Sequence, residues 1–362
     1  MKPDYSNRIK QFRKKMDLDL ACFISEKSNT NLYYFTGFKG FGVLLIFKKS
    51  PPIFIVSRLD SCKVQNKKLK LLVLGNGEKL SEIIKKNVKK KLIIGLDYPS
   101  LSIKNYNFFK KVINFSKSKD ISNLLSNLRE RKDNYEIEQI ERACDISCDI
   151  LKKCIKKIPF FSDESEIKQF IELEAKKKGF EMSFETIVAS EKNGAKIHYE
   201  LCNDKLKKGF LVIDFGIKIN EYCSDMTRTF YLGVPSSKEI EMYEKVRTVQ
   251  DESIEKFKLN LTPFEIDTYV RQILGKEYIH SLGHGVGLDI HENPGISILN
   301  KEKIVENAVF TIEPGVYFEN KYGIRIEDTV VKQKNTIKAL TLFTKELIII
   351  DCNKKIIDKK NV

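Results

Sequence analysis

Two acidic residues lie inside apolar, strand-like runs in the middle of this sequence. The run LVIDFG places Asp214 among Leu, Val, Ile and Phe, and CSDMTRTFYL places Asp225 in a similar run eleven residues later. A buried carboxylate without a partner is costly, so each acid should have a strong partner. The connecting GIKINEY is short enough for a hairpin that brings the two aspartates side by side. Adjacent carboxylates repel each other unless cations lie between them.

The same pattern recurs towards the C-terminus, where FTIEPGV contains Glu313 and GIRIEDTVV contains Glu327. For any one of these acids, a salt bridge at the end of a strand is an equally good explanation. Together with a histidine, the four acids make a site of hard oxygen ligands with one nitrogen ligand. So many carboxylates favour two divalent cations that share some of the acids.

Histidine is scarce in this chain, and three of its four histidines lie in HSLGHGVGLDIHE, residues 280–292. These are His280, His284 and His291, and the fourth is His198 in NGAKIHYE. Taken alone, the stretch suggests a metal cluster of three histidines. Its three glycines would let the backbone turn tightly enough to present all three side chains.

The first third of the chain alternates compact apolar runs with helical stretches, a pattern typical of an α/β domain. Runs suited to buried strands lie at 20–25, 42–47, 53–56, 71–74 and 92–97. The polar stretch RERKD then precedes residues 133–157, where apolar residues recur at helical spacing. We therefore expect two domains, residues 1–128 and residues 129–362.

The second domain is expected to contain two further helices and then strands. Ser236 has a glutamate three residues later, the spacing of a capping box, which predicts a helix to about Lys258. Thr262 followed by proline predicts another helix, to about Leu274. Strand-like runs follow at 308–318, 323–331 and 346–351.

Composition limits the classes of partner. The net charge of +15 comes from lysines spread over many short runs, without a recognisable nucleic-acid-binding motif, so we expect no nucleic-acid partner. No apolar run reaches the roughly 18 residues of a membrane span, and the N-terminus is too charged for a signal peptide. We therefore expect a cytoplasmic protein without membrane attachment. The eight cysteines are scattered without a CxxC pair, which is typical of reduced, mostly buried thiols.

In order along the chain, LVIDFG, CSDMTRTF, HSLGHGVGLDIHE, TIEPG and RIEDTV resemble the pita-bread metallopeptidases, in the branch of the Xaa-Pro aminopeptidases and prolidases. Residues 25–47, SEKSNTNLYYFTGFKGFGVLLIF, are similar to the creatinase/prolidase N-terminal domain. The resemblance extends over nearly the whole chain. It implies an α/β (α+β) protein, in which a creatinase/prolidase-like α/β domain is followed by a pita-bread catalytic domain.

The resemblance also implies five metal ligands, of which two, Asp225 and Glu327, bridge two metal ions. Asp214 is then a ligand of the first ion, and His284 and Glu313 are ligands of the second. Ligation by so many carboxylates favours Mn²⁺, and Co²⁺ or Zn²⁺ could occupy the same site.

The remaining histidines and one arginine correspond to family residues around the substrate. His198 matches a histidine near the scissile bond, and His280 and His291 match histidines that line the substrate pocket, where imidazole stabilises a developing oxyanion. Arg325 lies two residues before the second bridging acid, on the same strand face, and matches an arginine that supports the site by hydrogen bonding. Glu313 is also expected to pass a proton to the leaving nitrogen.

The implied reaction is hydrolysis of the peptide bond before proline, by a water held between two metal ions. The substrates are peptides with proline at the second position. The motif KIHY at residues 196–199 and the compact length of the chain favour an Xaa-Pro aminopeptidase. The nearest alternative is an Xaa-Pro dipeptidase (prolidase), and a non-catalytic peptide-binding protein on the same fold is a third. Family members are often dimers, so we expect a homodimer.

Overall fold

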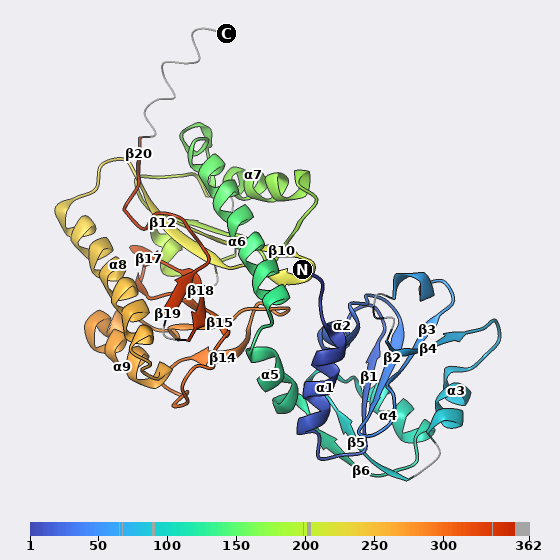
Figure 1. Ribbon diagram of the computed structural model, residues 1–362. Coiled ribbons are helices and arrows are strands. Elements are labelled where there is room, and N and C mark those ends of the chain that lie inside the picture. Colours follow the sequence, from blue (N-terminus) through green and yellow to red (C-terminus); the bar gives the residue numbers. More distant parts are fainter. Residues whose placement is uncertain are drawn as a thin grey trace, which may run out of the picture. The chain divides into compact units, whose positions relative to one another are not determined.

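The computed structural model describes residues 1–64, 66, 68–88, 91–197, 199–200, 204–334 and 336–351. The chain divides into two compact units, residues 2–129 and a second unit that begins at Glu130. Each unit combines β-sheet with helices, so the α/β prediction is confirmed (Figure 1). None of the helices in the described ranges is long and apolar enough to cross a membrane.

The first unit is built on a mixed sheet with the strand order β4-β3-β2-β1-β5-β6. The central strand β1 pairs antiparallel with β2 and parallel with β5. The strands are β1 (Leu20–Ser25), β2 (Gly42–Phe47), β3 (Ile53–Ser57), β4 (Lys70–Leu74), β5 (Leu92–Leu96) and β6 (Phe115–Asp120). The helices are α1 (Tyr5–Lys15), α2 (Thr30–Thr36), α3 (Leu80–Asn87), α4 (Ile103–Val112) and α5 (Ser122–Glu130).

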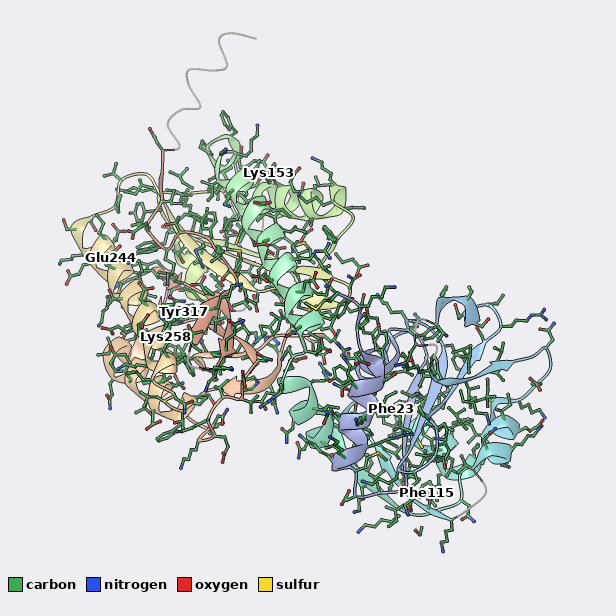
Figure 2. All side chains as sticks on the ribbon, in the orientation of Figure 1. Phe23, Phe115, Lys153, Glu244, Lys258 and Tyr317 are labelled. Carbon is green, nitrogen blue, oxygen red and sulfur yellow. The ribbon has the colours of Figure 1, made fainter. Side chains whose placement is uncertain are left out.

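Both faces of β1 are buried. Phe23, labelled in Figure 2, packs against Phe12 of α1 and Phe35 of α2, with ring centroids 6.2 and 5.5 Å apart. Its neighbour Cys22 points to the opposite face, into an apolar cluster that includes side chains of α3 and α4. Because neither face meets water, the strand is a continuous apolar run, LACFIS, without polar alternation.

The described strands of the second unit form two main sheets, with the orders β20-β12-β9-β8 and β14-β13-β15-β18-β19, and two smaller ones. Figure 1 shows these strands between helices α6 and α7 on one side and α8 and α9 on the other. The helices are α6 (Asn134–Ile155), α7 (Glu164–Lys177), α8 (Ser237–Lys258) and α9 (Pro263–Leu274). The strands are β7 (Glu181–Met182), β8 (Ile187–Ser190), β9 (Gly209–Phe215), β10 (Ile217–Ile219), β11 (Tyr222–Cys223), β12 (Met226–Leu232), β13 (Gly283–Gly285), β14 (Glu292–Ile296), β15 (Val309–Ile312), β16 (Gly315–Phe318), β17 (Tyr322–Arg325), β18 (Asp328–Gln333), β19 (Thr336–Ala339) and β20 (Ile349–Ile350).

Strand β9 separates two apolar cores. Leu211 and Ile213 belong to the cluster that contains side chains of α6 and α7, and Phe210 belongs to the cluster with α8 and α9. Since side chains alternate along a strand, Asp214 lies on the same side as Phe210. β9 pairs antiparallel with β12, with Asp214 opposite Thr227, so the predicted hairpin is confirmed.

The three predicted helices of the second unit begin at side-chain caps. α6 follows Asp133, which forms a capping box with the third residue of the helix. α8 follows the predicted capping box of Ser236 and Glu239, and α9 follows Thr262 with proline in its first turn. These caps bond amide groups that the first helical turn leaves unpaired, which explains why the sequence predicts the starts well.

The prediction that all four acids lie within strands is wrong for three of them. Asp214 lies inside β9, but Asp225 immediately precedes β12, Glu313 lies between β15 and β16, and Glu327 lies between β17 and β18. The runs predicted at 308–318 and 323–331 are therefore each divided in two. At the end of a strand the backbone leaves the regular pleat, so a side chain can turn towards residues of another sheet.

None of the three glycines after His280 adopts the left-handed backbone that glycine makes available to a tight turn. Neither Gly283 nor Gly285 has a positive φ. A Cβ atom at Gly283 would lie 2.2 Å from the carbonyl oxygen of Thr311, and one at Gly285 would lie 2.2 Å from that of Asn293. Close approach of neighbouring backbone therefore requires glycine at both positions.

Gly283→Ala is expected to lower the free energy of unfolding by about 1–3 kcal/mol, because the new methyl group must displace the backbone of β15. The matched control is Gly295→Ala in the paired strand β14, where no atom lies within 4 Å of an added Cβ. That change should stay within about 0.5 kcal/mol. Equilibrium urea denaturation measures both values, and equal losses in the two variants would contradict the packing argument.

Candidate metal centre

Four of the predicted ligand residues come together: Asp225, Glu313 and Glu327 lie beside strand ends, and His284 lies within β13. One ligand atom each from Asp225, His284 and Glu327 lies within 4.8 Å of the others. His284 Nε2 is 3.5 Å from Asp225 Oδ2 and 3.4 Å from Glu313 Oε1. Carboxylate oxygens and an imidazole nitrogen at this spacing can share a metal ion.

The fifth predicted ligand, Asp214, comes from the middle of β9 and is buried. Its Oδ2 accepts a hydrogen bond of 2.6 Å from Nη2 of Arg325. Its Oδ1 is also buried and meets no hydrogen-bond donor among the residues that the structure describes. A buried carboxylate oxygen without a donor, beside further acids, fits a cation-binding position.

Burial and neighbouring negative charges disfavour the ionised form of three of the clustered acids. Burial, followed by the charges of Glu327 and Asp214, raises the pKa of Asp225 well above its usual range. Burial, followed by Glu313 and Asp214, raises the pKa of Glu327 in the same way. Burial also raises the pKa of Glu313 to about 7, although the nearby Arg325 opposes the shift. Such carboxyl groups are the ones that a bound cation would stabilise in the ionised form.

The imidazole of His284 presents one nitrogen to the acids. Its Nδ1 lies 3.1 Å from the carbonyl oxygen of Gly285, so a proton on Nδ1 leaves the lone pair of Nε2 free. Its backbone amide donates to Thr311 Oγ1 at 3.0 Å, and that hydroxyl donates to Glu313 Oε1 at 3.0 Å. Burial lowers the pKa of His284, which favours the neutral, ligating form.

Arg325 connects two of the acids through its guanidinium. Besides the bond to Asp214, its Nε donates to Thr227 Oγ1 at 3.0 Å. The Thr227 hydroxyl donates to Glu327 Oε2 at 2.6 Å. The predicted supporting arginine therefore contacts one acid directly and another through a threonine.

Two of the predicted substrate histidines, His280 and His291, contact residues of this site. His280 Nε2 is 3.0 Å from the hydroxyl of Tyr317, which accepts a bond of 2.9 Å from Arg325 Nη1. Figure 2 labels Tyr317 within the second unit. The exposed His291 packs edge-to-face on His284, with ring centroids 4.3 Å apart. His198 lies outside the described residues.

Sequence reasoning missed three hydroxyl residues of the site, Thr227, Thr311 and Tyr317. Thr227 and Thr311 each lie two positions from a predicted ligand, so strand alternation could have indicated them. Tyr317 had no such signal, because its role depends on the contact between Arg325 and His280.

Residues 138–334 match the family described as Metallopeptidase family M24, and residues 8–131 match the Creatinase/Prolidase N-terminal domain. The chain is 34% identical over 350 residues to the Xaa-Pro dipeptidase of Pyrococcus furiosus, with 94% of this chain and 99% of that protein covered. The crystal structure of the X-Pro aminopeptidase from Thermotoga maritima MSB8 is 29% identical, with a TM-score of 0.86 and coverage of 94% and 100%. The prolidase from Thermococcus sibiricus is 30% identical, with a TM-score of 0.86 and coverage of 96% and 100%.

Glu313→Gln is expected to change how the stability of the metal-free protein depends on pH. The folded-state pKa of Glu313, about 7, lies above the ordinary value of 4.5, so the folded protein binds more protons between these values than the unfolded chain. The stability that protonated Glu313 contributes is fully present below about pH 4.5 and is lost as the pH rises through about 7. The unfolding free energy of the unaltered protein minus that of the variant should fall by at least about 1 kcal/mol over this range.

Urea denaturation with a chelator present, at a series of pH values, measures this difference. A difference that does not change with pH would contradict the burial of an unneutralised carboxyl group at this position.

Proposed function

We propose that this chain, which belongs to metallopeptidase family M24, is a dinuclear Xaa-Pro dipeptidase that hydrolyses the bond before proline. The observation that carries the proposal is the convergence of buried acids with raised pKa values on the imidazole of His284. Family membership supports a metal-dependent peptide hydrolase. It argues against a peptide-binding protein without activity, because the whole predicted ligand set is present.

The choice of dipeptidase departs from the aminopeptidase that the sequence favours. The Pyrococcus furiosus relative, named Xaa-Pro dipeptidase, aligns over nearly the whole of both chains, and the Thermococcus sibiricus structure is named prolidase. These names support the dipeptidase better. The similar Thermotoga maritima structure carries the name X-Pro aminopeptidase, so fold similarity alone does not separate the two reactions.

The proposed centre holds two divalent cations. When ionised, the four acids carry three more negative charges than Arg325 balances, and one divalent cation would leave part of this charge unneutralised. We propose Mn²⁺ because most ligands are carboxylates, with Co²⁺ or Zn²⁺ as alternatives. Bound cations would lower the pKa of a water molecule and polarise the substrate carbonyl. The proposed ligands are Asp214, Asp225, His284, Glu313 and Glu327, with Asp225 and Glu327 as the bridges.

The side chains around the centre orient the substrate and move protons. The carboxyl group of Glu313 lies beside the proposed centre, 3.4 Å from His284 Nε2, and we assign it proton transfer to the proline nitrogen. The exposed imidazole of His291 beside His284 can donate to the carbonyl oxygen of a substrate. We propose that His280 and His198 also act on the substrate side. Cytoplasmic location and a homodimer stay predictions.

With Mn²⁺, kcat/KM for Ala-Pro is expected to exceed that for Ala-Pro-Ala by at least about tenfold. A dipeptidase must bind the free carboxylate of proline close to the acids, whereas an aminopeptidase needs an open path beyond proline. Chromatographic detection of released alanine measures both rates, with Ala-Ala as the control for the proline requirement. Faster cleavage of the tripeptide would favour the aminopeptidase, and cleavage of neither peptide would favour a binding protein.

Asp225→Asn is expected to lower kcat/KM for Ala-Pro by at least about 100-fold, because a neutral amide is a poor bridge between two cations. Glu244→Gln is the control, since Glu244 lies on α8 and pairs with Arg247 at the periphery of the second unit (Figure 2). Rates are compared at saturating Mn²⁺. Full metal-dependent activity in Asp225→Asn would contradict the assignment.

A further inference from the structure

Arg228 of β12 is a buried arginine that contacts the backbone of two residues of the candidate centre. Its Nη1 donates to the carbonyl oxygen of Thr227 at 3.0 Å and to that of Glu327 at 2.5 Å. The amide of Glu327 donates to the same Thr227 carbonyl at 3.1 Å. Arg228 therefore links β12 to the segment between β17 and β18. At this point Thr227 of β12 and Glu327 of the segment direct their side chains into the centre.

The rest of the guanidinium is fixed by further bonds. Nη2 donates to Asp328 Oδ1 at 2.7 Å and to the carbonyl oxygen of Phe343 at 2.9 Å, and Nε donates to that of Thr344 at 3.0 Å. The side chain of Arg228 is 1% exposed. Because its bonds engage all three nitrogens, the group cannot turn without leaving buried donors unpaired.

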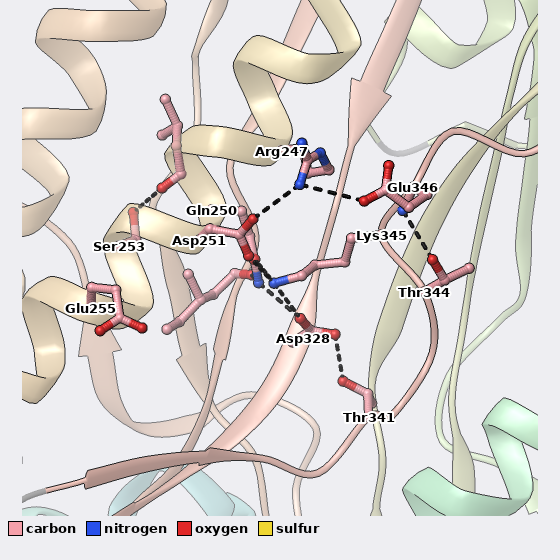
Figure 3. A network of polar contacts seen from close by, with 12 residues as sticks. Arg247, Gln250, Asp251, Ser253, Glu255, Asp328, Thr341, Thr344, Lys345 and Glu346 are labelled. Atoms are coloured by element: carbon pink, nitrogen blue, oxygen red, sulfur yellow. Dashed lines mark hydrogen bonds and ion pairs between the residues drawn. The ribbon is translucent and has the colours of Figure 1, made fainter.

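Asp328, which accepts a bond from Arg228, also belongs to a polar network beside α8. Figure 3 shows this network around Asp328. Its Oδ1 also accepts a bond of 2.8 Å from Thr341 Oγ1. Its Oδ2 lies 3.6 Å from Lys345 Nζ. The cationic partners Arg228 and Lys345 balance the charge of Asp328. The neighbouring Glu327 belongs to the acid cluster, where its charge is not balanced in this way.

Gln250 of α8 reaches a third strand of the centre. Its Nε2 donates to Asp328 Oδ2 at 3.0 Å and to the carbonyl oxygen of Ile312 at 3.4 Å. Ile312 directly precedes Glu313, and Gln250 has no exposed surface. The bonds of Arg228 and Gln250 therefore hold peptide groups next to the side chains of Thr227, Glu327 and Glu313.

We propose that Arg228 and Gln250, joined through Asp328, are positioning residues that set the metal affinity of the centre. By holding the peptide groups of Thr227 and Glu327, Arg228 fixes the separation at which the Thr227 hydroxyl reaches the Glu327 carboxylate, 2.6 Å away. Gln250 fixes the backbone beside Glu313 in the same way. The inference rests on the proposed function, since it concerns the binding of divalent cations. Groups that orient metal ligands commonly affect affinity about 10–100-fold.

The test is the affinity of the metal-free protein for Mn²⁺, measured by isothermal titration calorimetry in Arg228→Lys. Lysine keeps the positive charge but has too few fixed donors to hold both carbonyl groups and Asp328. The Kd for Mn²⁺ is expected to rise about tenfold or more. The control is Arg247→Lys, because Arg247 belongs to the network of Figure 3 but pairs only with the surface acids Glu244, Asp251 and Glu346 among the described residues.

A second readout separates positioning from a merely structural role. The rise in Tm that Mn²⁺ produces should be smaller in Arg228→Lys than in the unaltered protein or in Arg247→Lys. A variant that loses Tm equally with and without Mn²⁺, at an unchanged Kd, would overturn the inference.

If Arg228→Lys does not fold, Gln250→Leu decides. Leucine is similar in size to glutamine and removes the bonds to Asp328 and Ile312, while Asp328 keeps its bonds from Arg228 and Thr341. A higher Kd for Mn²⁺ supports the inference, and an unchanged Kd overturns it. Failure of the unaltered protein to bind Mn²⁺ would defeat the proposed function itself. Binding by the unaltered protein with equal affinity in the variants would defeat this inference alone.

Discussion

Four carboxyl groups buried close together cannot all stay ionised unless positive charge is placed among them. In this chain Arg325 bonds to one of them, Asp214. Burial, and after it the neighbouring acids, raises the pKa values of Asp225, Glu313 and Glu327. The apolar cores on both sides of β9 must stabilise the fold against this repulsion, and cations would remove it.

Two adjacent residues show that the surrounding contacts, and not burial alone, determine the charge. Glu327 and Asp328 are both buried. The pKa of Glu327 is raised by burial and by neighbouring acids. Burial also acts to raise the pKa of Asp328, but Arg228 and Lys345 outweigh it and the pKa is lowered. One strand end thus presents an acid that needs a cation on one side and an acid already paired on the other.

The sequence predicts the local elements well because their signals are local. The caps at Ser236 and Thr262 depend on residues three positions apart, and the apolar run of β1 depends on burial of both faces. Acids in apolar runs also indicate the candidate site, since burial of charge is costly wherever it occurs. The individual role of each ligand and histidine was implied only by the resemblance to a family.

The features that were not predicted depend on contacts between distant segments. The strand breaks at Asp225, Glu313 and Glu327 follow from packing between sheets, which a one-dimensional pattern does not contain. The sequence pattern also does not indicate the ion pair of Asp328 and Arg228, because these residues are 100 positions apart. The glycines at 283 and 285 were recognised as special, but the reason is the backbone that faces them.

The proposed function requires two divalent cations among the acids of the cluster. The most direct measurement is the free energy of unfolding as a function of free Mn²⁺ concentration, at a pH above the pKa of Glu313. Binding of two ions to the folded state alone predicts a gain of roughly 2.7 kcal/mol per tenfold increase in free Mn²⁺ once both sites are filled. Half that slope would contradict a dinuclear centre, and no dependence on Mn²⁺ would contradict a metal centre at these residues.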